Sequence, residues 1–155
     1  MKRLHIALLQ LAPEGSLEKN LQKGLEGCER ARRMGADIAL FPEMWSNGYA
    51  ISGKAAAALA AEAIPADGEF ICTFANLAAR LDMAVGVTLL ERSSGGPRNT
   101  LVLLDRRGKT ALTYAKVHTC DFGDERVLTP GDAFAVAEID TAAGPVHVGA
   151  MICYD

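Results

Sequence analysis

Short apolar runs alternate with stretches of helical periodicity in the first part of the chain. Apolar runs at residues 3–11 and 37–41 predict two buried strands. Between them, Ser16 is suited to cap the start of a helix that runs to about Met34, and Gly35 suits the position just past its end. Because a helix separates the two strands, we expect them to pair in parallel within an α/β sheet.

The rest of the chain continues with helical patterns and then changes to strands. Residues 54–64 are rich in alanine and predict a helix, and residues from about 67 to 81 carry apolar side chains on one helical face. The later strands are expected at residues 84–91, 99–104, 110–115, 134–139 and 146–152. Residues 116–133 show no periodicity, and a loop of that length inside a compact domain is usually functional.

Composition narrows the class of protein. The chain has 155 residues, enough for one domain, of which 50% are hydrophobic and 23% charged. This balance excludes a disordered chain, and the net charge of −3 gives no electrostatic case for a nucleic-acid partner. No apolar run reaches the ~20 residues that span a bilayer, so no membrane partner is expected. His5 and Gln10 interrupt the apolar start, which argues against a signal peptide and for a cytoplasmic protein.

The four cysteines are widely spaced and form no C-x-x-C pair, which argues against a zinc site or a disulfide framework. We expect one functional thiol, Cys153, and three incidental ones. Cys28 and Cys72 lie in helical patterns and are interpreted as small packed hydrophobic residues. Cys120 lies in the long loop.

Three residues that suit acyl transfer each follow an apolar run: Glu43, Lys116 and Cys153. Sites in open α/β sheets gather at the carboxyl ends of strands. A carboxylate between apolar neighbours suits a general base, and a lysine near a thiol can stabilise both a thiolate and a tetrahedral oxyanion. Backbone N–H groups at a strand-to-helix turn would favour a thiolate there. Taken singly, the three are also compatible with a solvated glutamate, a surface lysine and a buried structural cysteine.

Two further residues of the long loop are candidates for supporting roles. His118 lies two positions after Lys116 and is expected to shape the loop through hydrogen bonds rather than to act as a second base. Glu125 is either a solvated loop charge or, if it reaches the pocket, a residue that positions substrate or orients Lys116. His118, Cys120 and Asp121 lack the spacing of a metal site.

Four motifs occur together in one order along the chain. They are Phe-Pro-Glu at 41–43, Tyr-x-Lys-x-His at 114–118, Pro-Gly-Asp at 130–132 and Ile-Cys-Tyr-Asp at 152–155. Each alone is common, but in this register the chain resembles the nitrilase superfamily of carbon–nitrogen hydrolases over its whole length.

The resemblance implies a Glu43–Lys116–Cys153 triad with Glu125 as an additional active-site glutamate. Glu43 would act as general base and Cys153 as the nucleophile that forms a thioester, while Lys116 and the Tyr154 backbone N–H stabilise the oxyanion. The implied substrate is a small amide or carbamoyl compound, less often a nitrile, and no metal or organic cofactor is implied.

The resemblance also implies that Trp45, Asn47 and Tyr49 line the pocket mouth. The implied fold is a four-layer α-β-β-α sandwich, usually in a homo-oligomer. Family members are nearly twice as long, so residues 1–155 are expected to form the amino-terminal part of one domain, about the first half of the sandwich, with the carboxyl-terminal part absent. We expect this chain alone to be inactive. The alternatives are a non-catalytic remnant or assembly module, or a second chain that supplies the missing half.

Overall fold

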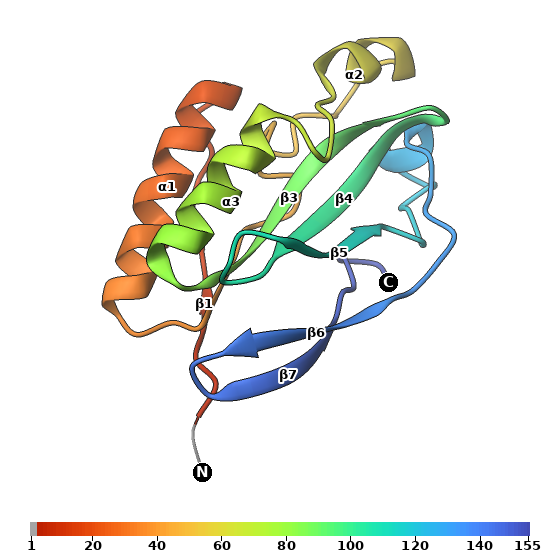
Figure 1. Cartoon of the computed structure of the whole chain (residues 1–155). Coiled ribbons are helices and arrows are strands. Elements are labelled where there is room, and N and C mark those ends of the chain that lie inside the picture. The colour runs from red at the N-terminus through yellow and green to blue at the C-terminus, as the bar shows by residue number, and fades with distance from the viewer. Residues whose placement is uncertain (1–2) are drawn as a thin grey trace.

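The computed structural model describes residues 3–155 and contains a five-stranded sheet, a separate two-stranded sheet and three α-helices (Figure 1). The helices are α1 (Leu17–Arg33), α2 (Ala56–Glu62) and α3 (Glu69–Leu81), with a short 3₁₀ helix η1 (Asp124–Val127). The strands are β1 (Ile6–Leu8), β2 (Ile38–Leu40), β3 (Ala84–Ser93), β4 (Gly96–Leu104), β5 (Thr110–Ala115), β6 (Val136–Thr141) and β7 (Gly144–Gly149). The prediction of an α/β fold is confirmed.

The large sheet has the order β1-β2-β3-β4-β5. β1 and β2 are parallel, as the strand–helix–strand pattern predicted; β3 is also parallel to β2, while β4 is antiparallel to both β3 and β5. This arrangement brings the carboxyl ends of β2 and β5 and the amino end of β4 to the same end of the sheet, the end at which β2, β3 and β5 finish. Loops that leave this end can therefore bring side chains from distant parts of the chain together.

Helix α1 begins and ends where its sequence signals predict. The Ser16 hydroxyl accepts a hydrogen bond from the Lys19 N–H at 3.3 Å, which satisfies one of the free donors of the first turn. Met34 caps the carboxyl end, and Gly35 follows with a φ of +84°, a left-handed conformation that suits glycine.

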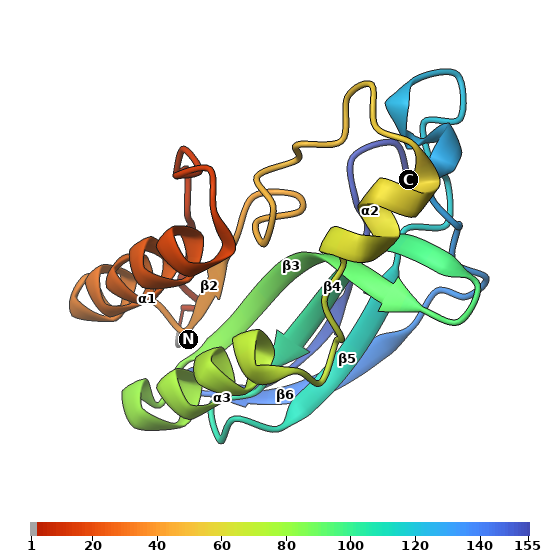
Figure 2. The ribbon, with the colours of Figure 1, turned by 90° about the horizontal axis from the view of Figure 1, so that it is seen from above.

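The large sheet is covered differently on its two faces. α1 and α3 lie side by side on one face, and the β6–β7 hairpin lies against the other (Figures 1 and 2). The core on the helical side includes Phe41, Trp45, Phe74, Val85 and Val102. The core on the hairpin side includes Leu101, Leu103, Leu112, Tyr114, Ile139 and Ile152. The sheet is thus the middle layer between helices and hairpin.

The prediction that the first strand is buried is wrong. β1 has only three residues, and Ile6 and Leu8 are 52% and 63% exposed. β1 is an edge strand, and an open cavity of about 410 Å³, lined in part by Ile6, Ile38 and Val148, separates this part of the sheet from β7. The hairpin therefore leaves the apolar outer side of β1 uncovered.

The prediction that Cys72 is a packed residue is also wrong, whereas Cys28 is buried as predicted. The buried face of α3 is formed by Phe70, Ile71, Phe74, Leu77 and Ala78. Cys72 points away from this face and is exposed, and its thiol donates to the Asp67 carbonyl oxygen at 3.4 Å.

Among residues 3–155, every helix is too short or too polar to cross a membrane.

We expect Gly24→Ala to destabilise the fold, because Gly24 is the point where α1 approaches the aromatic core. A Cβ atom there would lie 2.8 Å from the Phe74 ring, 2.9 Å from Trp45 Nε1 and 3.0 Å from the Phe41 ring. Overpacking of this kind costs about 1–3 kcal/mol. That exceeds the gain in helix propensity of about 1 kcal/mol from glycine to alanine.

Gly27→Ala is the matched control in the same helix. A Cβ atom at Gly27 would meet only the ends of leucine side chains, at 3.0 Å from Leu11 Cδ1, and these ends can shift. Urea unfolding should show a loss of stability for Gly24→Ala and no loss for Gly27→Ala. Equal effects at the two positions would contradict the packing argument.

Candidate active site

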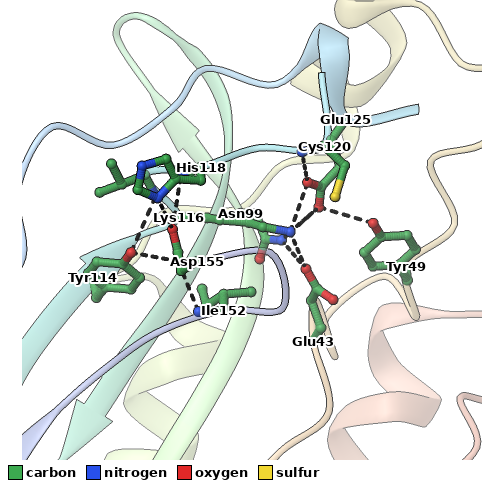
Figure 3. A network of polar contacts seen from close by, with 11 residues as sticks. Glu43, Tyr49, Asn99, Tyr114, Lys116, His118, Cys120, Glu125, Ile152 and Asp155 are labelled. Carbon is green, nitrogen blue, oxygen red and sulfur yellow. Dashed lines mark hydrogen bonds and ion pairs between the residues drawn. The ribbon is translucent and has the colours of Figure 1, made fainter. Parts of the chain in front are cut away.

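The polar residues of the candidate site come from three strand ends at one end of the sheet. Glu43 follows β2, Lys116 follows β5, and Asn99 lies near the start of β4 (Figure 3). The Lys116 N–H donates to the Asn99 carbonyl oxygen at 2.8 Å and so extends the β4–β5 pairing by one bond. The observed strand order and the loops that leave it therefore bring Glu43 and Lys116 together.

The Lys116 ammonium lies between two carboxylates. Its Nζ atom is 3.0 Å from Glu43 Oε1 and 3.0 and 2.8 Å from the two oxygens of Glu125. The Lys116 side chain has no exposed surface, so the alternative of a surface lysine is wrong. Burial acts to lower the pKa of Lys116, but the hydrogen bonds and charges of Glu125 and Glu43 outweigh it and hold the pKa above its ordinary value. Lys116 is therefore a permanent cation.

Glu125 is buried and fully engaged, so its interpretation as a solvated loop charge is wrong. Besides Lys116, its carboxylate accepts hydrogen bonds from the Tyr49 hydroxyl at 3.0 Å and from the Cys120 N–H at 2.7 Å. Burial acts to raise the pKa of Glu125, but the Cys120, Lys116 and Tyr49 donors outweigh it and hold the pKa below its ordinary value. Glu125 therefore stays ionised beside Lys116.

Asn99 joins the two carboxylates and was missed by sequence reasoning. Its Nδ2 atom donates to Glu43 Oε1 at 2.7 Å and to Glu125 Oε1 at 3.1 Å. The two carboxylates accept but do not donate, so the amide must turn its NH₂ group toward them. This leaves Asn99 Oδ1 buried without a partner among residues 3–155. The available signal was a single asparagine shortly before the apolar residues 101–104 of the same strand.

Glu43 differs from Glu125 in keeping one oxygen free. Both of its hydrogen bonds, from Lys116 and Asn99, fall on Oε1, and within residues 3–155 Oε2 has no hydrogen-bond partner. The Glu43 side chain is 24% exposed, compared with 1% for Glu125. Glu43 and Cys153 line the same cavity of about 140 Å³. The other residues that line it are Leu40, Phe41, Thr88, Leu101, Met151 and Ile152.

Cys153 lies on a turn rather than directly at the end of a strand. The strand predicted over residues 146–152 ends at Gly149, because its partner β6 begins opposite it at Val136 and offers no further pairing. Cys153 is exposed and has a φ of +48°, which is uncommon for a residue with a side chain. The Asp155 N–H closes the turn by donating to the Ile152 carbonyl oxygen at 3.1 Å.

His118 is held by Asp155, a residue that sequence reasoning did not single out. The His118 N–H donates to Asp155 Oδ1 at 2.8 Å, and the His118 ring nitrogen Nδ1 lies 3.2 Å from the same oxygen. These contacts agree with the prediction that His118 shapes its loop through hydrogen bonds. The acidic residue at the end of the Ile-Cys-Tyr-Asp motif was the available signal for Asp155.

Of the three predicted pocket-mouth residues, Trp45 is buried, Asn47 is half-buried and Tyr49 is exposed. Trp45 is 1% exposed, stacks on Phe41 and donates from Nε1 to the Asn20 carbonyl oxygen at 3.0 Å, so its placement at the pocket mouth is wrong. Tyr49 is 38% exposed, and its hydroxyl reaches Glu125 (Figure 3). Tyr154 is 59% exposed, and its ring packs edge-on against Phe122.

Within the described part of the chain, no group of three His, Cys, Asp or Glu residues is arranged to hold a metal ion.

We expect Lys116→Met to cost about 3–5 kcal/mol of folding stability, because it leaves two carboxylates in a buried site without their cation. Lys54→Met is the matched control. Lys54 pairs with Glu62 at 2.7 Å, but its side chain is 33% exposed, and such pairs contribute about 0–1 kcal/mol. Urea unfolding at pH 7 measures both values. Similar losses for the two variants would contradict the buried-ion argument.

The lowered pKa of Glu125 also predicts a pH dependence of stability. The stability that ionised Glu125 adds to the fold is present above the ordinary pKa of 4.5 and is lost as the pH falls toward the lower pKa of the folded state. Glu125→Gln should therefore unfold at a lower temperature at pH 7 and lose less stability than the wild type between about pH 5 and pH 3. Thermal unfolding by circular dichroism tests this, and parallel pH curves for the two proteins would contradict it.

The sequence also matches known proteins over almost its whole length. The profile of the carbon-nitrogen hydrolase family matches residues 5–155. Nitrilase homolog 2 of Dictyostelium discoideum is 26% identical over 99% of this chain and 48% of its own. The chloroplastic omega-amidase of Arabidopsis thaliana is 26% identical over 100% of this chain and 43% of its own. The chain thus spans about half the length of the curated relatives that it matches.

Solved structures share the fold. A variant of the amidase from Nesterenkonia sp. AN1 superposes with a TM-score of 0.73 and 22% identity, covering 97% of this chain and 56% of its own. In that amidase structure the acetamide moiety of fluoroacetamide is covalently added at the active-site cysteine. The NitFhit protein of C. elegans superposes with a TM-score of 0.78 and 24% identity, covering 97% of this chain and 38% of its own. The family match over residues 5–155, together with this shared fold, shows that the chain belongs to the carbon-nitrogen hydrolase family, within the nitrilase superfamily that its motifs resemble.

Proposed function

We propose that the protein hydrolyses the carbon–nitrogen bond of a small amide or carbamoyl compound, less readily of a nitrile, through a thioester on Cys153. One observation carries the proposal: Glu43 and Cys153 line one small cavity, and the Glu43 oxygen that is free of hydrogen bonds is the partner a thiol there requires. The family assignment and the amidases among its relatives support the same reaction class.

The two glutamates are assigned different roles because their surroundings differ. Glu125 is buried, and its oxygens are occupied by Lys116, Tyr49, Asn99 and the Cys120 N–H, so it serves to hold Lys116 and not to exchange protons. Glu43 keeps Oε2 available and is partly exposed at the cavity. A general base needs such an open oxygen within reach of its proton donor. Glu43 is therefore the base.

The reaction then proceeds in two halves. Glu43 takes the thiol proton of Cys153 while the sulfur attacks the carbonyl carbon of the amide, and the carbonyl oxygen becomes an oxyanion. The protonated Glu43 gives its proton to the leaving nitrogen, ammonia or an amine departs, and a thioester remains. Glu43 next takes a proton from water, which attacks the thioester carbon. The acid is released, and the Cys153 sulfur recovers a proton from Glu43.

The oxyanion is stabilised by Lys116 and by the backbone N–H of Tyr154. Lys116 supplies a fixed positive charge, and because its side chain has no exposed surface, water screens that charge little. No metal or organic cofactor is required for this sequence of steps.

The cavity favours a small acyl group. Its volume is about 140 Å³. Leu40, Phe41, Leu101 and Ile152 give it apolar walls. Short aliphatic amides match both its size and its polarity.

We further propose that residues 1–155 represent the amino-terminal part of a single hydrolase domain and that this chain alone turns over slowly or not at all. The chain spans about half the length of its curated relatives, which favours this proposal and the alternative of a non-catalytic remnant or assembly module. A second chain that completes the fold is a third possibility. Self-association and a cytoplasmic location stay predictions from the sequence.

Thiol alkylation tests the proposal without requiring turnover. Iodoacetamide should modify Cys153 ahead of Cys72, although both are exposed, and ahead of Cys120 and Cys28. Burial raises the pKa of Cys120 and raises that of Cys28 to about 12, so few of their thiols ionise at pH 7. Mass spectrometry of tryptic peptides over time gives the four rates. Equal rates at Cys153 and Cys72 would contradict an activated thiol.

Two substitutions separate the roles within the site. Glu43→Gln should slow alkylation of Cys153 by tenfold or more, since it removes the base, while Glu138→Gln, an exposed glutamate on β6, should leave the rate unchanged. Cys153→Ala should abolish any ammonia release from short amides. Rapid Cys153 alkylation without ammonia release would favour the remnant or a missing second half. Ammonia release that persists in Cys153→Ala would overturn the proposed reaction.

A further inference from the structure

The turn that presents Cys153 needs a support, because its backbone is in an unfavourable conformation. A residue with a side chain in the left-handed region costs about 1–3 kcal/mol and persists only where its surroundings hold it. Cys153 has a φ of +48° and is exposed, so its own side chain packs against little that would hold it. The support must therefore come from neighbouring residues.

Asp155 supplies that support from within the turn. Its side chain has no exposed surface, and its Oδ2 accepts a hydrogen bond from the Ile152 N–H at 2.9 Å. Its own N–H donates to the Ile152 carbonyl oxygen at 3.1 Å. The two bonds clamp the residues on either side of Cys153 to each other, which restricts the backbone angles that Cys153 can adopt.

The same carboxylate also binds the chain on both sides of Lys116. Oδ2 accepts from the Tyr114 hydroxyl at 2.6 Å, and Oδ1 accepts from the His118 N–H at 2.8 Å (Figure 3). The Tyr114 hydroxyl in turn accepts from the Val117 N–H at 3.3 Å. Asp155 therefore fixes the Cys153 turn relative to the one segment, residues 114–118, that carries the buried ammonium.

The charge states suit this arrangement. Burial acts to raise the pKa of Asp155, but the Tyr114, His118 and Ile152 donors outweigh it and hold the pKa below its ordinary value. Burial and the contact with Asp155 raise the pKa of Tyr114 to about 12. At neutral pH the pair is an ionised acceptor and a neutral donor, which makes a strong hydrogen bond.

We infer that Asp155 is a positioning residue: it holds the left-handed Cys153 turn in place and aligns the thiol with Lys116 and Glu43 through its bonds to Ile152, Tyr114 and His118. The inference adds a positioning residue to the proposed site. It rests on the proposed function, because the alignment of the thiol matters for catalysis only if Cys153 is the nucleophile. Asp155 itself touches none of the reacting atoms.

The test compares three variants. Asp155→Asn replaces one acceptor oxygen by a donor, so it removes about half of the hydrogen bonds. Tyr114→Phe removes the bond to Asp155 and the bond from the Val117 N–H to the same hydroxyl, but it keeps the bonds between Asp155 and Ile152. Ile139→Val is the matched control, because Ile139 is buried on the hairpin side of the sheet and loses one methylene without touching Asp155.

The first readout is the rate of iodoacetamide alkylation at Cys153 divided by that at Cys72 in the same molecule. We expect a fall of about tenfold in Asp155→Asn, the effect of losing a hydrogen bond to a charged group. Tyr114→Phe should show a smaller fall and Ile139→Val none. An unchanged ratio in Asp155→Asn, or an equal fall in Ile139→Val, would overturn the inference.

The second readout is hydrogen exchange at the Ile152 and His118 amides, measured by NMR. Both should exchange about tenfold faster or more in Asp155→Asn, since their acceptor is weakened, while Ile139→Val should leave their exchange relative to the core amides of β4 unchanged. This readout does not depend on thiol reactivity. If wild-type Cys153 reacts no faster than Cys72, the proposed function fails, and amide exchange still decides whether Asp155 holds the turn.

Discussion

The Lys116 ammonium is buried between the carboxylates of Glu43 and Glu125, and removing a single charge from water costs several kcal/mol unless its partners are close and well oriented. This requirement constrains much of the surrounding chain. The loop after β2, the amino end of β4, the end of β5 and the η1 helix must all reach the same point. One cation serves two carboxylates, so Asn99, Tyr49 and the Cys120 N–H are needed as additional donors. The long loop after β5 is ordered around this cluster.

The same requirement for donors gives Glu43 and Glu125 different chemical properties. Each donor added to Glu125 makes protonation less favourable and leaves it as a fixed counter-ion. Glu43 shares only Oε1 with Lys116 and Asn99, its second oxygen has no hydrogen-bond partner within residues 3–155, and Glu43 lines the same cavity as Cys153. Two glutamates that look alike in the sequence thus acquire different capacities from the number of donors that reach them.

The sequence predicted the parallel pairing of β1 and β2, through the helix between them, and the bounds of α1, because Ser16 and Gly35 are local signals and act within one turn of the helix. It also brought Glu43 and Lys116 forward as candidates through their place after apolar runs and through the family motifs, and Glu125 through the long loop and the family resemblance. It did not reveal Asn99 or Asp155, since Asn99 bonds Glu43 and Glu125, 56 and 26 positions away, and Asp155 bonds Tyr114 and His118, 41 and 37 positions away. Trp45 was misplaced for a related reason: an aromatic residue after a glutamate gives no indication of which side of the loop faces the helices.

The misplacement of Trp45 has a practical consequence. It is the only tryptophan in the chain, it lies two residues after Glu43, and its indole is enclosed by Phe41 and the α1 backbone around Asn20. Indole emission shifts to longer wavelength when water reaches the ring. The intrinsic fluorescence of this protein is therefore a local optical probe of the loop that holds Glu43, and it reports that loop's opening or closing without an attached label.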